Sequence, residues 1–276
     1  MIRNIGIEKF NKDKRERLTS CGTEPATFET FIKDHKEKTD TGFPLRPVDS
    51  TINTPTNKID WLISKILIQL LAYIPSHLKN TNDLLERFKV VDTSILDDNM
   101  FFISLDVVNL YPSIPIAAGL EAVIEFAGKM WSRINSYGLS IEDLKKCLSF
   151  ISYNYEVLFQ KKTYLQIKGC PMGAHFSPPF AMIYMYNIER TALDKLKQDF
   201  DFSPTIYARY IDDLILGPLD RNKNIIESIV QTFNTIDENI KFTVEIPKEN
   251  VPLKFLDLSI TILGNKINYQ WYRKET

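Results

Sequence analysis

Two adjacent aspartates, Asp212 and Asp213, separate two apolar runs in the C-terminal half of the chain. The runs, Thr205–Tyr210 and Leu214–Leu216, have the length and residue types of buried β-strands, and the short connection predicts a tight hairpin. Adjacent carboxylates in such a setting repel each other and lose hydration, so their burial is costly unless something offsets it. A divalent cation is the simplest candidate, because Mg²⁺ takes carboxylate oxygens and keeps positions open for phosphate.

A third aspartate, Asp106, ends another apolar run, which begins at Met100 and also predicts a buried strand. Two metal ions about 4 Å apart, held by these acids, can activate a hydroxyl nucleophile and stabilise a leaving pyrophosphate. An exposed turn is the competing interpretation of Asp212 and Asp213. Aspartate is common in turns, and the dipeptide alone favours that interpretation.

The rest of the chain predicts a mixture of helices and strands. Helices are expected at 57–74, 80–88, 116–132, 139–152, 177–200 and 223–236, a hairpin at 155–167, and two or three strands within 242–272. Residues 1–57 are polar and rich in turn formers, and 39–56 are expected to be loop or extended chain. Because strands and helices do not alternate regularly, the expected fold class is α+β.

Composition limits the classes of protein to which the chain can belong. Apolar residues make up 44% and charged residues 25% of the 276 residues, which is typical of a globular protein. The formal net charge of −1 counts against a uniformly basic nucleic-acid coat, but it allows a local basic groove. Three dispersed cysteines give neither a zinc site nor a disulfide framework, which fits a reducing, intracellular setting. The most apolar run, Trp61–Ile74, is too short and too interrupted to span a bilayer, so no membrane association is expected.

Three segments resemble the motifs of reverse transcriptases, in the order that the family has them. Ser104–Pro115 resembles motif A, Gly169–Pro178 resembles motif B, and Tyr210-Ile-Asp-Asp213 resembles the Y-x-D-D signature of motif C. One motif alone would be a weak signal. Three in order, each on the expected strand, loop or hairpin, form a specific pattern.

In detail the chain is most similar to the Penelope-like retroelements. Phe43–Val48, preceded by His35-Lys36, resembles their fingers segment, and Leu253–Leu258 with Tyr272–Lys274 resembles the segments after motif C. The resemblance implies a right-hand polymerase with an antiparallel palm sheet backed by helices. It implies part of the fingers at 1–98, palm with motif A at 99–117, fingers and palm helices with a hairpin at 118–167, and palm with motifs B and C at 168–276. The thumb, and the GIY-YIG endonuclease of those polyproteins, are expected to be absent from this chain.

The resemblance also implies a metal site and a sugar-selecting residue. Asp106 and Asp212 would ligate two Mg²⁺ ions, for which Mn²⁺ can substitute, with help from the backbone carbonyl of Val107. Asp213 would be a weaker or more distant ligand. Tyr111 falls where the family has a bulky steric gate, whose ring would clash with a 2′-hydroxyl and so select deoxynucleotides. A core aromatic is the alternative interpretation of Tyr111.

Five further residues match positions at which the family handles the nucleotide. Met172 and Gly173 fall where it contacts the incoming nucleotide and the templating base, and a glycine there lets backbone approach a ligand closely. Arg46 matches the fingers arginine that would clamp the triphosphate, assisted by Lys36. Lys241 would protonate the leaving pyrophosphate. The alternatives are an ordinary turn glycine at Gly173 and solvated surface charges at the three basic residues.

The activity implied is RNA-directed DNA polymerisation, in which the 3′-hydroxyl of a DNA primer on an RNA template attacks the α-phosphate of a dNTP. The alternatives are an RNA-dependent RNA polymerase and a catalytically weak or inactive fragment that acts as an RNA-binding or scaffold protein. Tyr111 and Tyr210 argue against the first, which often has a smaller gate residue and a Gly-Asp-Asp turn. The intact acids argue against the second. Retroelement biology implies a nuclear location, and the oligomeric state is left open.

Overall fold

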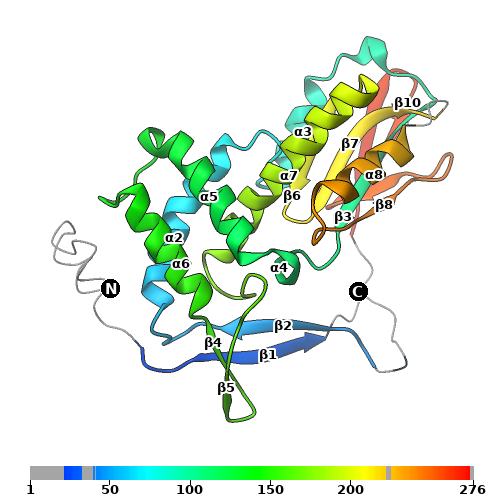
Figure 1. Ribbon diagram of the computed structural model, residues 1–276. Coiled ribbons are helices and arrows are strands. Elements are labelled where there is room, and N and C mark those ends of the chain that lie inside the picture. The colour runs from blue at the N-terminus through cyan, green and yellow to red at the C-terminus, as the bar shows by residue number, and fades with distance from the viewer. Residues whose placement is uncertain (1–21, 33–39, 41, 222–224, 274–276) are drawn as a thin grey trace. The chain divides into compact units, whose positions relative to one another are not determined.

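The computed structural model describes residues 22–32, 40, 42–221 and 225–273 (Figure 1). The chain divides into two compact units, each of which combines stretches that are separated in the sequence. Unit 1 takes in the chain up to Tyr73 together with Tyr111–Tyr184, and unit 2 takes in Ile74–Leu110 and Met185–Glu275.

Unit 2 is built around a four-stranded sheet whose strand order is β6-β7-β3-β8. Its strands are β3 (Met100–Val107), β6 (Ile206–Tyr210), β7 (Asp213–Asp220) and β8 (Phe242–Glu245), and every neighbouring pair is antiparallel. The two central strands, β3 and β7, are apolar and almost wholly buried through their middle residues, because both faces of the sheet are covered. The apolar runs on either side of the acids are therefore buried strands, as predicted.

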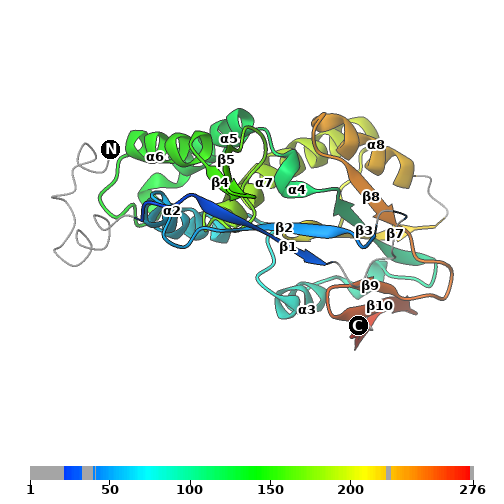
Figure 2. The same ribbon diagram turned by 90° about the horizontal axis from the view of Figure 1, so that it is seen from below.

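Other secondary-structure elements cover both faces of this sheet (Figure 2). One face packs on α3 (Thr81–Lys89) and on a small antiparallel sheet of β9 (Leu253–Phe255), β10 (Leu258–Leu263) and β11 (Lys266–Trp271). Their shared core includes Phe88, Phe102, Ile215 and Phe255. The other face carries α8 (Ile226–Ile236), whose Phe233 stacks on Tyr207. Helix α3 begins at the N-cap Asn80, whose side chain accepts a hydrogen bond from the backbone of Asp83.

Unit 1 contains a group of helices with buried apolar faces. They are α2 (Asn57–Leu70), α5 (Ile116–Met130), α6 (Ile141–Tyr153) and the first part of α7 (Ser177–Phe200), with the short α4 at Leu110–Ser113. A capping box of Ser140 and Asp143 starts α6, and each of the two side chains satisfies a backbone N–H of the first turn. Single 3₁₀ turns are η3 (Leu71–Tyr73), η4 (Thr93–Ile95) and η5 (Trp131–Arg133), and η4 belongs to unit 2.

A second four-stranded sheet, of order β2-β1-β4-β5, completes unit 1. Its strands are β1 (Ala26–Ile32), β2 (Leu45–Ser50), β4 (Glu156–Phe159) and β5 (Lys162–Leu165), and only the pair β1 and β4 is parallel. The two-residue turn Gln160-Lys161 has φ values of 49° and 64°, so it is the left-handed turn that a tight hairpin requires. The hairpin predicted at 155–167 is confirmed.

The α+β class is confirmed, and so are the helices and strands expected from residue 57 onward. Two expectations need correction. Strand β1 lies where only irregular structure was expected, and four strands rather than two or three follow residue 241. The pattern missed β1 because only its first residue, Ala26, is buried, so the strand has no apolar alternation. No helix in the described part of the chain is long and apolar enough to cross a bilayer.

Candidate active site

Asp106 and Asp213 lie opposite each other on the two central strands of unit 2. Asp106, near the end of β3, is paired in register with Asp213, the first residue of β7. Directly opposed residues of an antiparallel pair place their Cβ atoms about 4.5–5.5 Å apart on one face, where like charges repel. The sheet register therefore brings together two of the three acids that the sequence singled out.

Asp212 lies in the two-residue turn between Tyr210 and Asp213, which are themselves a hairpin pair. The carbonyl of Asp212 accepts a hydrogen bond from the N–H of Val107 at 3.2 Å, so the turn is tied to the end of β3. Ile211 has φ +56°, a left-handed conformation that β-branched residues rarely adopt and that costs about 1–3 kcal/mol. The candidate metal-binding turn is thus held in a strained conformation.

The three acids keep contact with water, which corrects the expectation that their burial needs an offset. Asp106 is exposed and Asp212 and Asp213 are half-buried, whereas Leu105 and Leu214 beside them have no exposed surface. The hydration of the carboxylates is therefore largely retained. What remains unfavourable is the repulsion between Asp106 and Asp213, which a cation between them would relieve.

A pocket of about 420 Å³ opens beside Asp106 and Asp213 in unit 2. Its other lining residues are Ser104, Thr243, Val244, Glu245, Lys254, Phe255 and Leu256. The hydroxyl and carboxylate oxygens here are the ligands that Mg²⁺ prefers, so the donor set fits the ion that the motifs imply. Among the described residues, no three His, Cys, Asp or Glu side chains gather closely enough to hold a metal. A third carboxylate, such as that of Asp212, has to turn toward the pair before all three can bind one ion.

In unit 1, the loop from Gly169 to Phe176 is tied by backbone hydrogen bonds to two other segments. The N–H of Cys170 donates to the carbonyl of Tyr111 at 2.8 Å, and the carbonyl of Met172 accepts from the N–H of Asp49 at 2.6 Å. The structure therefore joins Tyr111 and Met172, with its neighbour Gly173, to strand β2, on which Arg46 lies.

Both glycines of this loop are needed for close packing. Gly169 has φ +80°, and a Cβ there would lie 2.7 Å from the Cα of Pro112. Gly173 has φ +131°, and a Cβ there would lie 1.9 Å from the carbonyl oxygen of Asp49. The close backbone approach at Gly173 is thus to β2, and its contact with a nucleotide stays a prediction.

Asp60 of α2 anchors the far end of the same loop. Its carboxylate accepts hydrogen bonds from the backbone N–H groups of His175 at 2.8 Å and Phe176 at 2.7 Å, and it faces the His175 ring. Burial raises the pKa of Asp60, while these two hydrogen bonds act in the opposite direction. Sequence reasoning missed this residue, although Asp60 is the single acidic residue of α2, a signal that could have been noticed.

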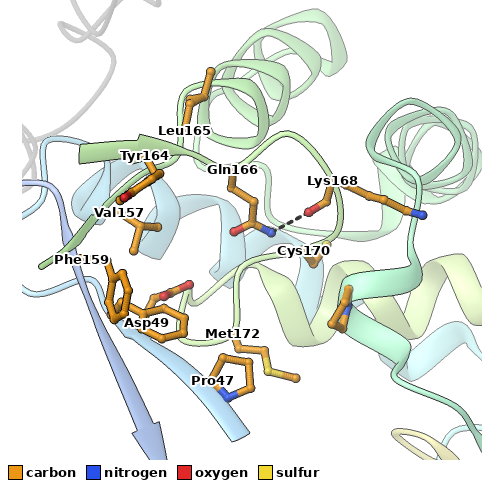
Figure 3. Close-up of a pocket in the computed structure, with 12 residues that line it drawn as sticks. Pro47, Asp49, Val157, Phe159, Tyr164, Leu165, Gln166, Lys168, Cys170 and Met172 are labelled. Atoms are coloured by element: carbon orange, nitrogen blue, oxygen red, sulfur yellow. Dashed lines mark hydrogen bonds between the residues drawn. The ribbon is translucent and has the colours of Figure 1, made fainter. Parts of the chain in front are cut away.

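A second pocket, of about 510 Å³, lies within unit 1 beside Met172 (Figure 3). Its other lining residues are Phe28, Pro47, Asp49, Pro112, Val157, Phe159, Tyr164, Leu165, Gln166, Lys168 and Cys170. Most of the walls are apolar, and the carboxylate of Asp49 lies among them. Its Oδ1 is buried and has no hydrogen-bond partner among the described residues, and burial raises the pKa of Asp49 to about 6.

Asp49 should make the stability of the protein depend on pH. Between about pH 4 and 6 the folded state keeps a proton on Asp49 that the unfolded state has lost, so the free energy of unfolding should fall as pH rises through this window and stay level above it. Asp49→Asn should remove this slope and raise the thermal midpoint at pH 7.5 but not at pH 4. Thermal unfolding at both pH values, with the exposed Asp199→Asn as control, tests this. An unchanged slope in Asp49→Asn would contradict it.

The three basic residues expected to act on the nucleotide or the pyrophosphate take no part in the hydrogen bonds described above. Arg46 is exposed on β2, where it can reach a ligand from solvent. The ammonium of Lys241 donates to the carbonyls of Asn234 at 3.0 Å and Asp237 at 3.2 Å, so it caps the C-terminal end of α8. Lys36 lies outside the residues that the structure describes. The roles of these basic residues in catalysis stay predictions.

Comparison with known proteins decides the family. The family model described as reverse transcriptase (RNA-dependent DNA polymerase) matches residues 44–267, which include all three motifs. The chain belongs to the reverse transcriptase family. A sequence comparison with curated proteins finds no significant match.

Solved polymerase structures share the fold of this reverse transcriptase family member. Apo telomerase from Candida tropicalis, truncated from its C-terminal domain, matches with a TM-score of 0.60 and 13% identity over 91% of this chain and 56% of that one. Telomerase from Candida albicans, with a fragment of telomeric RNA, matches with a TM-score of 0.59 and 10% identity over 89% of this chain and 46% of that one. The RNA-dependent RNA polymerase of BmCPV matches with a TM-score of 0.59 and 11% identity over 97% of this chain and 24% of that one. The chain thus spans about half the length of the telomerases, and at these identities the likeness shows the fold of polymerase fingers and palm.

Proposed function

We propose that this chain carries the polymerase site of an RNA-directed DNA polymerase, which transfers a nucleotide from a dNTP to the 3′-hydroxyl of a primer. The observation that carries the proposal is the register of β3 and β7, which places Asp106 opposite Asp213 beside the Tyr210–Asp213 turn. Because the chain belongs to the reverse transcriptase family, we interpret these two aspartates as ligands of the metal ions used in nucleotide transfer.

Asp106, Asp212 and Asp213, with the carbonyl of Val107, would hold two Mg²⁺ ions, for which Mn²⁺ can substitute. When bound, the ions would activate the primer hydroxyl and stabilise the leaving pyrophosphate. Within unit 2, the hydrogen bond from the N–H of Val107 to the carbonyl of Asp212 keeps the backbone of the turn at the end of β3, so only the side chain of Asp212 has to turn toward the pair when an ion binds.

Unit 1 supplies the candidate nucleotide-binding residues. Arg46 and Lys36 would hold the triphosphate, and Tyr111 would exclude the 2′-hydroxyl. Met172 and Gly173 would meet the base, and the apolar pocket beside Met172 suits the flat face of a base. Lys241, which belongs to unit 2, would protonate the pyrophosphate, a role that competes with its present bonds at the end of α8.

The finer assignment is a Penelope-like retroelement enzyme, on the segments Phe43–Val48 and Leu253–Leu258. An RNA template and a DNA primer are the partners that follow from it, and one similar telomerase structure contains RNA. A retrotransposon enzyme of this kind would work in the nucleus. The same proposal includes the division of the chain into fingers and palm. Part of the fingers lies at 1–98, palm at 99–117, fingers and palm helices with a hairpin at 118–167, and palm at 168–276.

The proposal is tested by primer extension with the 276-residue chain, an RNA template, a DNA primer, dNTPs and Mg²⁺. Extension that stops when Mg²⁺ is chelated and returns with Mg²⁺ or Mn²⁺ is the expected result. The absence of extension with either metal, together with RNA binding that does not need Mg²⁺, would instead favour an RNA-binding protein.

The gate residue separates a DNA polymerase from an RNA polymerase. Tyr111→Val should raise the use of ribonucleotides relative to deoxynucleotides by about tenfold to two hundredfold, because the ring that would meet the 2′-hydroxyl is gone. Tyr111→Phe keeps the ring and should keep the wild-type preference. The ratio of kcat/KM for dNTP and rNTP measures this. A wild-type preference for ribonucleotides would favour the RNA polymerase instead.

A further inference from the structure

Arg209 is a charged side chain with no exposed surface, on the strand that leads into the Tyr210–Asp213 turn. Its partner is Glu189 of α7, and the two side chains are 0% and 1% exposed. The Nε of Arg209 donates to Oε1 of Glu189, and the hydroxyl of Ser76 donates to Oε2 at 2.6 Å. A buried ion pair loses so much hydration that an apolar pair of similar volume is often as stable. Stability alone therefore does not explain the pair.

The guanidinium also reaches the turn itself. Nη1 of Arg209 donates to the carbonyl oxygen of Ile211 at 3.0 Å. Ile211 is the β-branched residue at φ +56°, and a hydrogen bond from a charged donor to its carbonyl helps to hold this unfavourable conformation. The following carbonyl, of Asp212, is the one that accepts from Val107. Two successive carbonyls of the turn are thus each held by a donor.

The backbone of Arg209 is fixed as well. Its N–H donates to the carbonyl of Ser76 at 2.7 Å, and its carbonyl accepts from the N–H of Leu78 at 2.8 Å. Glu189 then fixes the direction of the guanidinium by binding Nε, which leaves Nη1 directed at Ile211. The donor that meets the turn is consequently rigid, because both its backbone and its side chain are held by buried partners.

We propose that Glu189 and Arg209 are positioning residues, which fix the Ile211–Asp212 turn and so orient the carboxylates of Asp212 and Asp213 for a divalent ion. Neither residue needs to touch substrate, because each acts through the hydrogen bond to Ile211. The identity of the ion rests on the proposed polymerase function. The fixing of the turn does not depend on that function, so the two can be tested separately.

The test uses the double variant Glu189→Leu with Arg209→Met, which removes both charges at similar volume and leaves no unpaired buried charge. Ile211 then loses its donor. The amide of Val107, which donates to Asp212, should exchange its hydrogen about tenfold to a hundredfold faster, as measured by NMR. The dissociation constant for Mn²⁺, measured by electron paramagnetic resonance, should rise by a similar factor. Ile229→Val, a buried change in α8, is the control and should leave both values unchanged.

Each outcome decides one point. Wild-type exchange and wild-type Mn²⁺ affinity in a folded double variant would overturn the proposal. Faster exchange in the double variant, when even the wild type binds no Mn²⁺, would support the positioning role and contradict the polymerase function. If the double variant fails to fold, Arg209→Lys replaces it, since its ammonium lacks the planar fork that serves Glu189 and Ile211 together. Hydrogen exchange of the Val107 amide and the dissociation constant for Mn²⁺ are then measured in Arg209→Lys, and wild-type values of both would again overturn the proposal.

Discussion

Asp212→Asn is expected to lower the rate of primer extension by about a hundredfold or more, because it removes a negative ligand from a site that works by holding divalent ions. The thermal midpoint should stay close to that of the wild type. Asp212 is half-buried at a turn rather than in the core, and substitutions near the surface usually change stability by less than about 0.5 kcal/mol. Single-nucleotide extension under saturating dNTP, with thermal unfolding of the same preparation, measures both quantities.

The matched control for Asp212→Asn is Asp220→Asn. Asp220 ends the same strand, β7, at the opposite end from Asp213. The change of charge is identical, but the carboxylate removed lies away from the turn, so extension should continue at the wild-type rate. Equal extension by the wild type and Asp212→Asn would contradict the metal-site assignment. A loss in both variants would point to the charge of the strand rather than to the turn.

Gly173→Ala is expected to lower the free energy of unfolding by about 3–5 kcal/mol, which puts it among the most damaging single substitutions. The new Cβ would lie 1.9 Å from the carbonyl oxygen of Asp49, and φ is +131°, where residues with a side chain are strained. The neighbour is strand backbone rather than a flexible side chain, so β2 or the loop has to move. Urea denaturation followed by circular dichroism measures the loss.

Gly128→Ala is the control for this prediction. Gly128 lies within α5, and a Cβ there would meet nothing within 4 Å. Alanine in a helix is favoured over glycine by about 0.8–1 kcal/mol, so this variant should be slightly more stable than the wild type. A Gly173→Ala protein with wild-type stability would show that β2 and the loop do not approach as closely as described.

The sequence predicted those strands correctly whose buried residues form a continuous apolar run. Strand β3 and the hairpin at Tyr210–Asp213 were predictable because their apolar runs are bounded by acids and turn residues, and the acids themselves pointed to a metal site. Strand β1 was not predictable, because six of its seven residues are at least partly exposed and leave no apolar alternation.

Contacts between distant residues could not be predicted from pattern. Asp60 binds backbone of His175 and Phe176, and Glu189 binds Arg209 and Ser76, and nothing local in the sequence indicates such partners. The exposure of the three acids was also misjudged. They stand at strand ends, where the chain reaches the surface, although the strands themselves are buried.

The position of β3 between β7 and β8 has a consequence for synthesis on the ribosome. Both neighbours of this apolar strand are encoded well after it, and the last of them, β8, ends at Glu245, about 140 residues beyond Val107. At about 5–20 residues per second, Met100–Val107 waits roughly 7–28 seconds with at least one edge unpaired. An apolar strand in that state pairs readily with other chains. Chaperone occupancy of the nascent chain is therefore expected to raise the yield of this protein.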